Sequence, residues 1–119
     1  MVRVYQDKNA TQPSIKKFII EENFITIGSG TMSFTDGNII ISCAKVDDGL
    51  PFKYYDLLIR SMLHSVRDMG DIEIRVFCGH CEEQGYEAII LFEKLGFVRE
   101  DNFFIVRAKD INFKGSCNG

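Results

Sequence analysis

The amino-acid sequence predicts an α+β fold, or an α/β fold with a mixed sheet, in one domain over residues 1–110. Three observations predict it. The first third of the chain consists of short runs rich in β-branched residues, residues 52–69 have the apolar spacing of a helix, and strands and helices alternate after residue 38. A chain of 119 residues is long enough to bury a core without disulfides or metals.

Four strands are predicted in the first 46 residues. For SIKKFIIEE a short helix is the alternative, and we favour the strand. The Asp36-Gly37 turn between two β-rich runs is typical of a hairpin. No helix follows Gly28 and Gly30 to bind a nucleotide, so we expect a β-bulge or bend there. The four strands are expected at residues 3–6, 14–22, 24–34 and 38–46.

The periodicity of the sequence changes after the DDGLP stretch. Apolar residues recur at i, i+3, i+4 and i+7 between residues 55 and 69, which predicts an amphipathic helix that ends at Gly70. Residues 71–78 alternate between apolar and polar side chains and predict a strand. The strand–helix–strand order of residues 39–77 favours a parallel pair of strands.

The last third of the chain is expected to form a loop, a second helix and a hairpin around Asp101-Asn102. Gly96 is expected to stop the second helix. Residues 111–119 are expected to form a flexible tail that contains Cys117. The loop, the helix and the two strands are residues 78–81, 82–95, 97–100 and 103–110.

Composition excludes several classes of protein. A formal charge of −3 without a basic block argues against a nucleic-acid-binding protein. No apolar run is long enough to span a bilayer, and MVRVYQDKN lacks the core of a signal peptide, so we expect a cytoplasmic protein that does not bind membranes. In a reducing compartment the cysteines are expected to be free thiols, with Cys43 in the core because it lies in an apolar run.

The tetrapeptide Cys78-Gly79-His80-Cys81 suggests thiol redox chemistry. It lies between a predicted strand and a predicted helix, where a helix N-terminus lowers the pKa of a thiol. No proline follows it, no tryptophan precedes it, and too little chain remains for a thioredoxin fold. The motif supplies two zinc ligands where a structural site needs four, so we expect no metal. A redox or metal role of Cys78 and Cys81 stays an alternative.

The stretch LFEKLGF at residues 91–97, preceded by Ala88, resembles the C-terminal motif of the GNAT superfamily of acyl-CoA N-acyltransferases. The order of strands and helices is also similar, and the resemblance covers residues 39–110. It implies a mixed, mostly antiparallel sheet with two main helices, and acetyl-CoA or CoA as the cofactor. The family has two further helices near its N-terminus. This chain has little room for them, so we expect them to be shortened or missing.

The expected cofactor site departs from the pattern of the family. The family holds the CoA pyrophosphate with a glycine-containing loop at a helix N-terminus. In this chain the glycine positions carry Phe52 and Tyr54, Pro51 removes an N–H donor, and Asp56 adds negative charge, while Lys53 is the one favourable residue. We therefore expect a degraded acyl-CoA site. The residues that the resemblance places beside the cofactor are Cys43, Ala44, Lys45 and Lys53.

The residues expected to move protons also depart from the pattern. Phe92 replaces the tyrosine that in the family protonates the leaving thiolate, and Gly85 stands where the family often has asparagine. Substitutes for the missing acid are Cys78, Cys81 and Tyr86. The candidate bases are Glu82, Glu83 and Glu87, although acidic residues at a helix start are also explained by favourable capping.

Three functions follow from these residues. The first is a GNAT-like domain with a degraded acyl-CoA site that acts as a non-catalytic or weakly active binding or regulatory protein. A homodimer contact or a protein partner is expected at Phe52, Tyr54 and Tyr55 if these rings are exposed, and core packing of the rings is the alternative. The second is an acetyl-CoA-dependent N-acyltransferase with an atypical cofactor loop. The third is a thiol redox or metal protein that uses CGHC.

Overall fold

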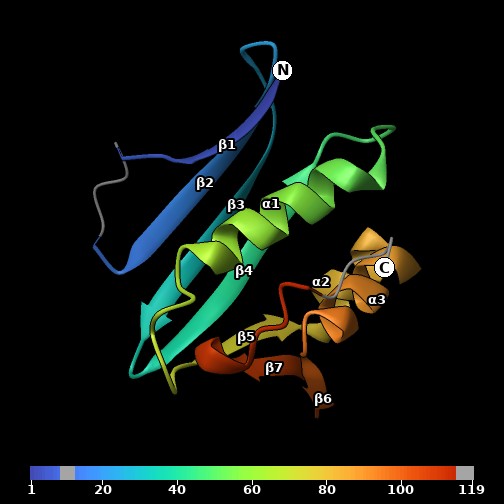
Figure 1. Cartoon of the computed structure of the whole chain (residues 1–119). Coiled ribbons are helices and arrows are strands. Elements are labelled where there is room, and N and C mark those ends of the chain that lie inside the picture. The colour runs from blue at the N-terminus through green and yellow to red at the C-terminus, as the bar shows by residue number, and fades with distance from the viewer. Residues whose placement is uncertain (9–12, 115–119) are drawn as a thin grey trace.

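The computed structural model describes residues 1–8 and 13–114. One sheet of seven strands runs through this part of the chain in the order β1-β2-β3-β4-β5-β7-β6 (Figure 1). Neighbouring strands are antiparallel except β4 and β5, which are parallel. The predicted α+β class, the mixed sheet and the parallel pair are therefore confirmed. The strands are β1 (Val2–Gln6), β2 (Ile15–Glu22), β3 (Ile25–Thr35), β4 (Asn38–Val46), β5 (Glu73–Phe77), β6 (Val98–Glu100) and β7 (Phe103–Arg107).

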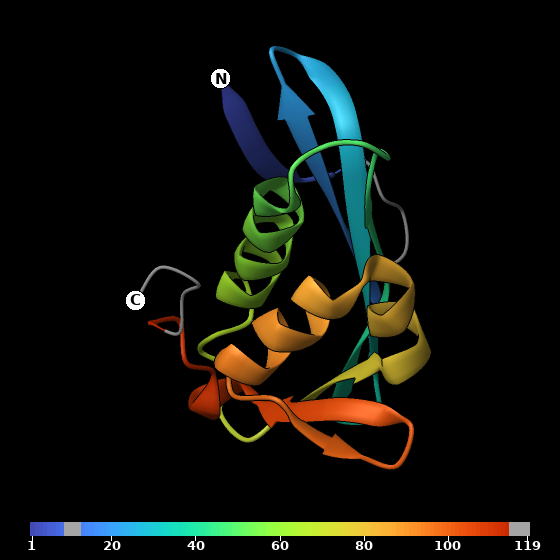
Figure 2. The same cartoon turned by 90° about the vertical axis from the view of Figure 1, so that its right-hand side faces the viewer.

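The main helices cover one face of this sheet (Figure 2). Ile39, Ile74 and Val106 lie opposite one another on β4, β5 and β7, and all three are buried in the core cluster together with side chains of α1 and α3. No helix in the described part of the chain has the length and apolar character needed to cross a membrane. The helices are α1 (Phe52–His64), α2 (Cys78–Gln84), α3 (Tyr86–Lys94) and the 3₁₀ turn η1 (Ala108–Asp110).

The opposite face of the N-terminal strands is polar. On β3, the buried Gly30 and Met32 alternate with Ser29, Thr31 and Ser33, which turn to this second face. The connection between β1 and β2 consists of residues 7–14, which is too short for two helices. The expected loss of the N-terminal helices therefore holds, and the serine and threonine side chains let this face contact water.

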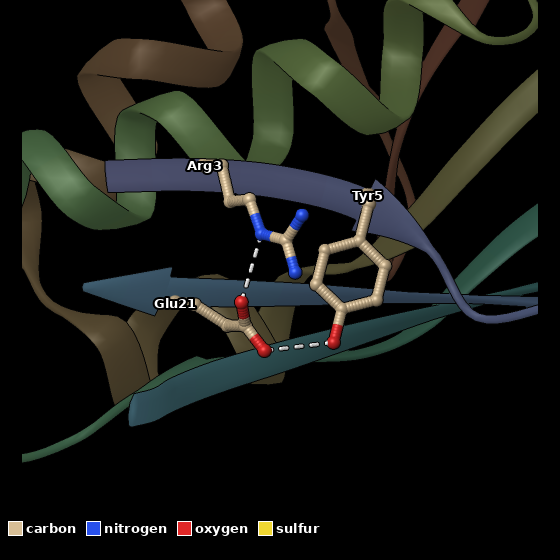
Figure 3. A network of polar contacts seen from close by, with 3 residues as sticks. All are labelled: Arg3, Tyr5 and Glu21. Atoms are coloured by element: carbon tan, nitrogen blue, oxygen red, sulfur yellow. Dashed lines mark hydrogen bonds and ion pairs between the residues drawn. The ribbon is translucent and has the colours of Figure 1, made fainter. Parts of the chain in front are cut away.

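A hydrogen-bonded triad on the polar face ties the edge strand β1 to β2 (Figure 3). Arg3 Nε donates to Glu21 Oε1 at 2.8 Å, and the Tyr5 hydroxyl donates to Glu21 Oε2 at 2.9 Å. These bonds hold the pKa of Glu21 below its usual value, with Arg3 as the largest cause and Tyr5 as the second. Val2 and Val4 on the same strand turn the other way and pack against the core.

Helix α1 is shorter than the sequence predicts. Regular helix ends at His64, and the chain continues in turns to Asp68 before Gly70 adopts a φ of 67°. The Ser65 hydroxyl donates to the carbonyl of Met62 at 2.6 Å, and the following backbone bonds span three residues instead of four. The last turn is therefore tightened, because a serine hydroxyl competes for a helix carbonyl.

The prediction of a CGHC loop followed by one helix was wrong. Strand β5 runs directly into α2, which begins at Cys78 and places Cys78 and Cys81 together on its buried side. The helix is then interrupted at Gly85, whose φ of 99° is unfavourable for residues with a side chain. The sequence signal for the break was this glycine, which we had considered only as a site residue.

The packed part of the chain extends beyond residue 110. Ile111 and Phe113 pack against the core, the Phe113 ring stacks on His64 with centroids 4.0 Å apart, and Arg60 donates to the Phe113 carbonyl at 3.2 Å. Cys117 and the rest of the expected tail, residues 115–119, lie outside the described residues.

Gly28 of β3 lies opposite Val46 of β4 and leaves no room for a side chain. A bulge beside it, where Glu21 pairs with Thr26 and Ile20 with Gly28, agrees with the prediction for this stretch. A Cβ atom at Gly28 would lie 2.5 Å from the carbonyl oxygen of Lys45 and 2.9 Å from the Cα atom of Val46. Backbone atoms cannot move aside as a flexible side chain can, so any larger residue must separate the two strands.

We therefore expect Gly28→Ala to lower the free energy of unfolding by about 1–3 kcal/mol, the usual cost of overpacking. Urea denaturation followed by circular dichroism measures it. Ser29→Ala is the matched control, because Ser29 turns to the polar face. Equal stability of Gly28→Ala and the unmodified protein would contradict the close approach of β3 and β4.

Candidate functional site: the cleft between β4 and α2

The two parallel strands of the sheet pair over only part of their length. Residues 38–41 of β4 pair with residues 73–76 of β5, and the last pair is Ile41 with Val76. The next residue of β4, Ser42, is an extra residue in its pairing with β3, since Thr31 lies opposite Cys43 and Met32 opposite Ile41. Such a bulge bends its strand. Strand β4 then continues along β3 to Val46, whereas β5 ends and leads directly into α2. A wedge therefore opens between β4 and α2.

A cavity of about 420 Å³ lies at the mouth of this wedge. The end of β4, the loop of residues 47–51, the start of α1 and the region around Gly85 all contribute to its walls. Lys45 and Tyr55 line it, whereas Lys53 does not, and the Lys53 ammonium group lies 5.4 Å from the centre of the Tyr54 ring. The lining residues are Lys45, Val46, Asp47, Asp48, Gly49, Leu50, Pro51, Phe52, Tyr55, Glu83, Gln84 and Glu87.

The charge around the cavity is strongly negative. Four carboxylates and one ammonium group line it, a net of −3, and they belong to Asp47, Asp48, Glu83, Glu87 and Lys45. The sequence analysis considered only Glu83 and Glu87 of these carboxylates, as bases. It overlooked Asp47 and Asp48, although the DDG run just before the predicted helix was the available signal.

Asp56 does not contribute to this charge. It is absent from the cavity wall and forms an ion pair with Arg60, one helical turn further along α1. The expectation that Asp56 repels a phosphate group is therefore not met, because the positive charge of Arg60 compensates the negative charge of Asp56. The negative field at the mouth comes from the loop before α1 and from the region around Gly85.

Tyr55 joins the two walls of the wedge. Its side chain is only 3% exposed, and its hydroxyl lies 3.4 Å from Nε2 of His80 on α2. Burial, followed by the nearby thiols of Cys81 and Cys43, raises the pKa of Tyr55 far above its usual value, so the hydroxyl stays protonated. The tautomer of His80 decides which group donates in this hydrogen bond, because a protonated hydroxyl can both donate and accept.

The possibility that Tyr55 belongs to an exposed aromatic group was wrong. Phe52 and Tyr54 are half-buried, and Tyr55 lies in the core cluster on the same helical face as Leu58 and Ile59. The i, i+3, i+4 spacing had already indicated this position. His80 was considered only as part of CGHC, and no sequence signal paired it with Tyr55.

The buried thiols of α2 lack the properties of a redox site. Cys78 and Cys81 are both buried and both free. Burial raises the pKa of Cys81 to about 12, whereas a reactive thiol needs a lowered pKa. No three His, Cys, Asp or Glu side chains within residues 1–8 and 13–114 are grouped closely enough to hold a metal ion.

Cys43 is exposed, so the prediction that it belongs to the core was wrong. The bulge at Ser42 explains the error, because one extra residue reverses which face the following side chains occupy. Ala44 consequently takes the buried position, and Cys43 shares the polar face with Thr31.

The two positions considered for the residue that protonates a leaving thiolate, Phe92 and Tyr86, lie in the core and on the surface. Phe92 is fully buried, with its ring packed edge-on against Phe97 and stacked on Phe104. Tyr86 is 74% exposed at the start of α3 and does not line the cavity. The structure therefore places neither residue in the wedge. Tyr55 is the tyrosine that lines it.

Stability is expected to fall as the solution is acidified, because burial lowers the pKa of His80. Glu83 opposes this shift with a smaller effect. The stabilisation is fully present above the unfolded value of about pH 6.5 and disappears as the pH falls through the lower folded pKa. Urea denaturation between pH 7.5 and pH 4.5, at about half-unit steps, measures this loss.

The same titrations on two histidine variants test whether His80 causes the loss of stability at low pH. His80→Gln should remove that part of the pH dependence, whereas His64→Gln, on the exposed end of α1, should retain it. Identical pH profiles for the unmodified protein and His80→Gln would contradict a half-buried His80 that remains neutral in the folded protein.

Thiol labelling should separate the cysteines of the cleft. Iodoacetamide is expected to modify Cys43 in the native protein, while Cys78 and Cys81 react only after unfolding, because they are buried. Peptide mass spectrometry at timed intervals gives the rate at each site. Fast native labelling of Cys81 would contradict its raised pKa and revive the redox interpretation.

Comparisons with known proteins agree on the fold. No protein-family model matches the sequence, and no curated protein matches it. Solved structures do match. One is a GNAT-family acetyltransferase from Desulfovibrio desulfuricans, with a TM-score of 0.69 and 11% identity over 91% of this chain and 99% of that chain.

Two further structures with this fold are acetyltransferases. The ribosomal-protein-S18-alanine N-acetyltransferase from Escherichia coli matches with a TM-score of 0.66 and 12% identity, over 84% of this chain and 79% of that chain. A GNAT-family acetyltransferase from Elizabethkingia anophelis with acetyl-CoA bound matches with a TM-score of 0.62 and 11% identity, over 89% and 97%. Identities this low establish architecture alone. The chain has the fold of the GNAT acetyltransferases.

Proposed function

We propose that this chain is a GNAT-fold binding protein whose acyl-CoA site is degraded, with weak or absent acyl transfer. The observation that carries the proposal is the charge of the cavity, where four carboxylates surround a single ammonium group. CoA brings several phosphate charges to a site. Each carboxylate about 8 Å from a phosphate charge opposes it by about 0.5 kcal/mol in water, and more where water is excluded.

The backbone at the start of α1 supports the same conclusion. Pro51 precedes the first helical residue and has no N–H group, and the N–H of Tyr54 is already bonded to the Pro51 carbonyl at 3.2 Å. A helix N-terminus attracts anions through its unpaired N–H groups, and side chains at Phe52 and Tyr54 obstruct the close approach that glycines permit. Phe92 supplies no proton for a leaving thiolate, since it is a core side chain.

An acetyl-CoA-dependent N-acyltransferase with an atypical loop is the second candidate. Its support is the geometry of the wedge, because β4 and β5 separate and α1 begins at the cavity. The protein from Elizabethkingia anophelis shows that the fold holds acetyl-CoA in another chain. Tyr55 lines the cavity and is the residue of this site that carries a hydroxyl group, which burial keeps protonated.

Calorimetric titration with acetyl-CoA and with CoA separates the two candidates. We expect no binding of either ligand at micromolar concentration. A variant with Asp47→Asn, Asp48→Asn, Glu83→Gln and Glu87→Gln should bind CoA about tenfold more tightly, because four opposing charges are removed. A Glu100→Gln, Asp101→Asn variant, at the end of β6 and in the turn to β7, lies outside the cavity lining, is the control and should not change the affinity.

Micromolar binding of acetyl-CoA by the unmodified protein, followed by acetyl transfer to an amine, would establish the second candidate instead. The thiol redox alternative lacks support, because the thiols of Cys78 and Cys81 are both buried.

A further inference from the structure

Strand β1 forms an unpaired edge of the sheet. The strand order places β1 at one end and β6 at the other, and β1 has no strand partner on its outer side within the described part of the chain (Figure 1). Proteins protect such edges with short strands and charged side chains. Strand β6 fits this pattern, because two of its three residues are charged. Strand β1 has five residues and carries two half-buried valines, so its edge is less protected.

The hydrogen bonds to β2 show which backbone groups of β1 face outward. The carbonyl of Met1 accepts from the N–H of Asn23, and the N–H of Asp7 donates to the carbonyl of Lys17. The register between these two bonds is regular, so the odd-numbered residues direct their N–H and C=O groups toward β2. The residues whose backbone groups point outward, none of which is buried, are Val2, Val4 and Gln6.

We propose that two copies of this chain form a dimer by antiparallel pairing of their β1 strands. A two-fold axis perpendicular to the sheet makes the strands antiparallel and keeps the two polar faces on one side and the two helical faces on the other. The axis passes beside Tyr5, so that Val4 of each copy lies opposite Gln6 of the other. Each of these pairs exchanges two backbone hydrogen bonds. The dimer goes beyond the proposed function and does not depend on what the cavity binds.

The charges of β1 select this register. Arg3, Tyr5 and Asp7 alternate onto the polar face, and with Tyr5 on the axis Arg3 lies directly opposite Asp7 of the second copy. Opposite charges in this position stabilise a pair of strands. With Val4 on the axis, Arg3 would instead be diagonal to both Arg3 and Asp7 of the second copy, so repulsion would offset the attraction.

The side chain of Arg3 is placed to make this contact. Its Nε donates to Glu21 within the chain (Figure 3), and a guanidinium group has several further N–H donors. The side chain is 56% exposed, and its guanidinium carbon lies 4.7 Å from the centre of the Tyr5 ring. Tyr5 of the second copy is a diagonal neighbour of Arg3 in this register, so its ring offers a second contact of the same kind.

The helical face of the edge also matches its own copy. Val2 and Val4 pack against the core, and in this register they lie opposite Lys8 and Gln6 of the second copy, which are both exposed. The methylene groups of these long side chains can cover the valines while their polar ends stay in water. A contact built on one strand from each copy is small, so we expect a dissociation constant in the micromolar range and not in the nanomolar range.

Sedimentation velocity of the full chain, from about 5 μM to about 1 mM, tests the dimer. We expect an equilibrium between monomer and dimer that depends on concentration. Gln6→Pro should weaken dimerisation at least about tenfold, because proline removes an outward N–H donor that β2 does not use. Gln6→Ala is the matched control, because it keeps this donor, and it should change the dissociation constant by less than about threefold.

A second pair of variants tests the charges. Asp7→Lys should weaken dimerisation at least about tenfold at low ionic strength, because it places like charges opposite each other on both sides of the axis. Glu100→Lys makes the same change of net charge on β6, at the opposite edge of the sheet, and should leave dimerisation unchanged.

Disulfide crosslinking reports the register. Residues directly opposite each other in a pair without hydrogen bonds have Cα atoms about 4.5 Å apart, within the range of a disulfide. Tyr5→Cys should therefore give a covalent dimer on oxidation, whereas Val4→Cys should not, because Val4 lies opposite Gln6. Both variants are made in a chain whose Cys43 and Cys117 are replaced by serine, since Cys43 is exposed.

Three results would overturn the inference. They are a protein that stays monomeric at about 1 mM, equal dimerisation of Gln6→Pro and Gln6→Ala, or crosslinking of Val4→Cys in preference to Tyr5→Cys. None of these measurements involves CoA, so failure of the dimer leaves the proposed function standing. Micromolar binding of CoA would overturn the proposed function and leave the dimer standing.

Discussion

The extra residue at Ser42 is the constraint on which the site depends. It lies directly after the last β4–β5 pair, at the only parallel contact of the described sheet. Beyond it β4 follows β3 to Val46, while β5 ends one residue later, at Phe77, and leads into α2, so the two strands separate. The bulge also reverses the faces of the following residues, so that Ala44 enters the core and Cys43 meets solvent. The bulge therefore explains the unexpected exposure of Cys43, and together with the end of β5 at Phe77 it accompanies the opening of the wedge.

A hydrogen bond between the side chains of Tyr55 and His80 closes the wedge on its inner side. The Tyr55 hydroxyl and the His80 imidazole are held together where burial disfavours both the phenolate and the imidazolium. An unpaired polar group in this place would lose its hydration without compensation, which is why α1 and α2 are joined by a hydrogen bond across the opening. The CGHC cysteines belong to this packing, as buried thiols beside a buried tyrosine.

The fold of this molecule is that of acetyltransferases that use an anionic cofactor, whereas the charge around its cavity is negative. The overall fold matches acetyltransferase structures that share 11–12% identity with this chain, with TM-scores from 0.62 to 0.69. The residues around the opening would repel the phosphates of the cofactor that one of those structures holds. Since function depends on the site and not on the fold, the side chains of the loop before α1 carry more weight than the shared topology.

The sequence by itself determined most of the fold. Runs rich in β-branched residues located the N-terminal strands, and alternation between apolar and polar side chains located the strand at residues 71–78. The face shared by Tyr55, Leu58 and Ile59 located α1, and the LFEKLGF stretch indicated the last helix and the hairpin. These features depend on neighbouring residues, so local patterns reveal them. The candidate cofactor residues Cys43, Ala44 and Lys45 lie on the part of β4 beyond its last pair with β5, and their role in binding a cofactor stays a prediction.

Only the tertiary structure decided what the site contains. The Tyr55–His80 bond joins residues 25 positions apart, and the carboxylates at 47, 48, 83 and 87 come together from both sides of the wedge. The bulge at Ser42 is defined by how β4 pairs with β3, and the residue type at that position does not indicate it. Contacts between distant segments are set by how whole elements pack, and a pattern read along one segment does not contain them.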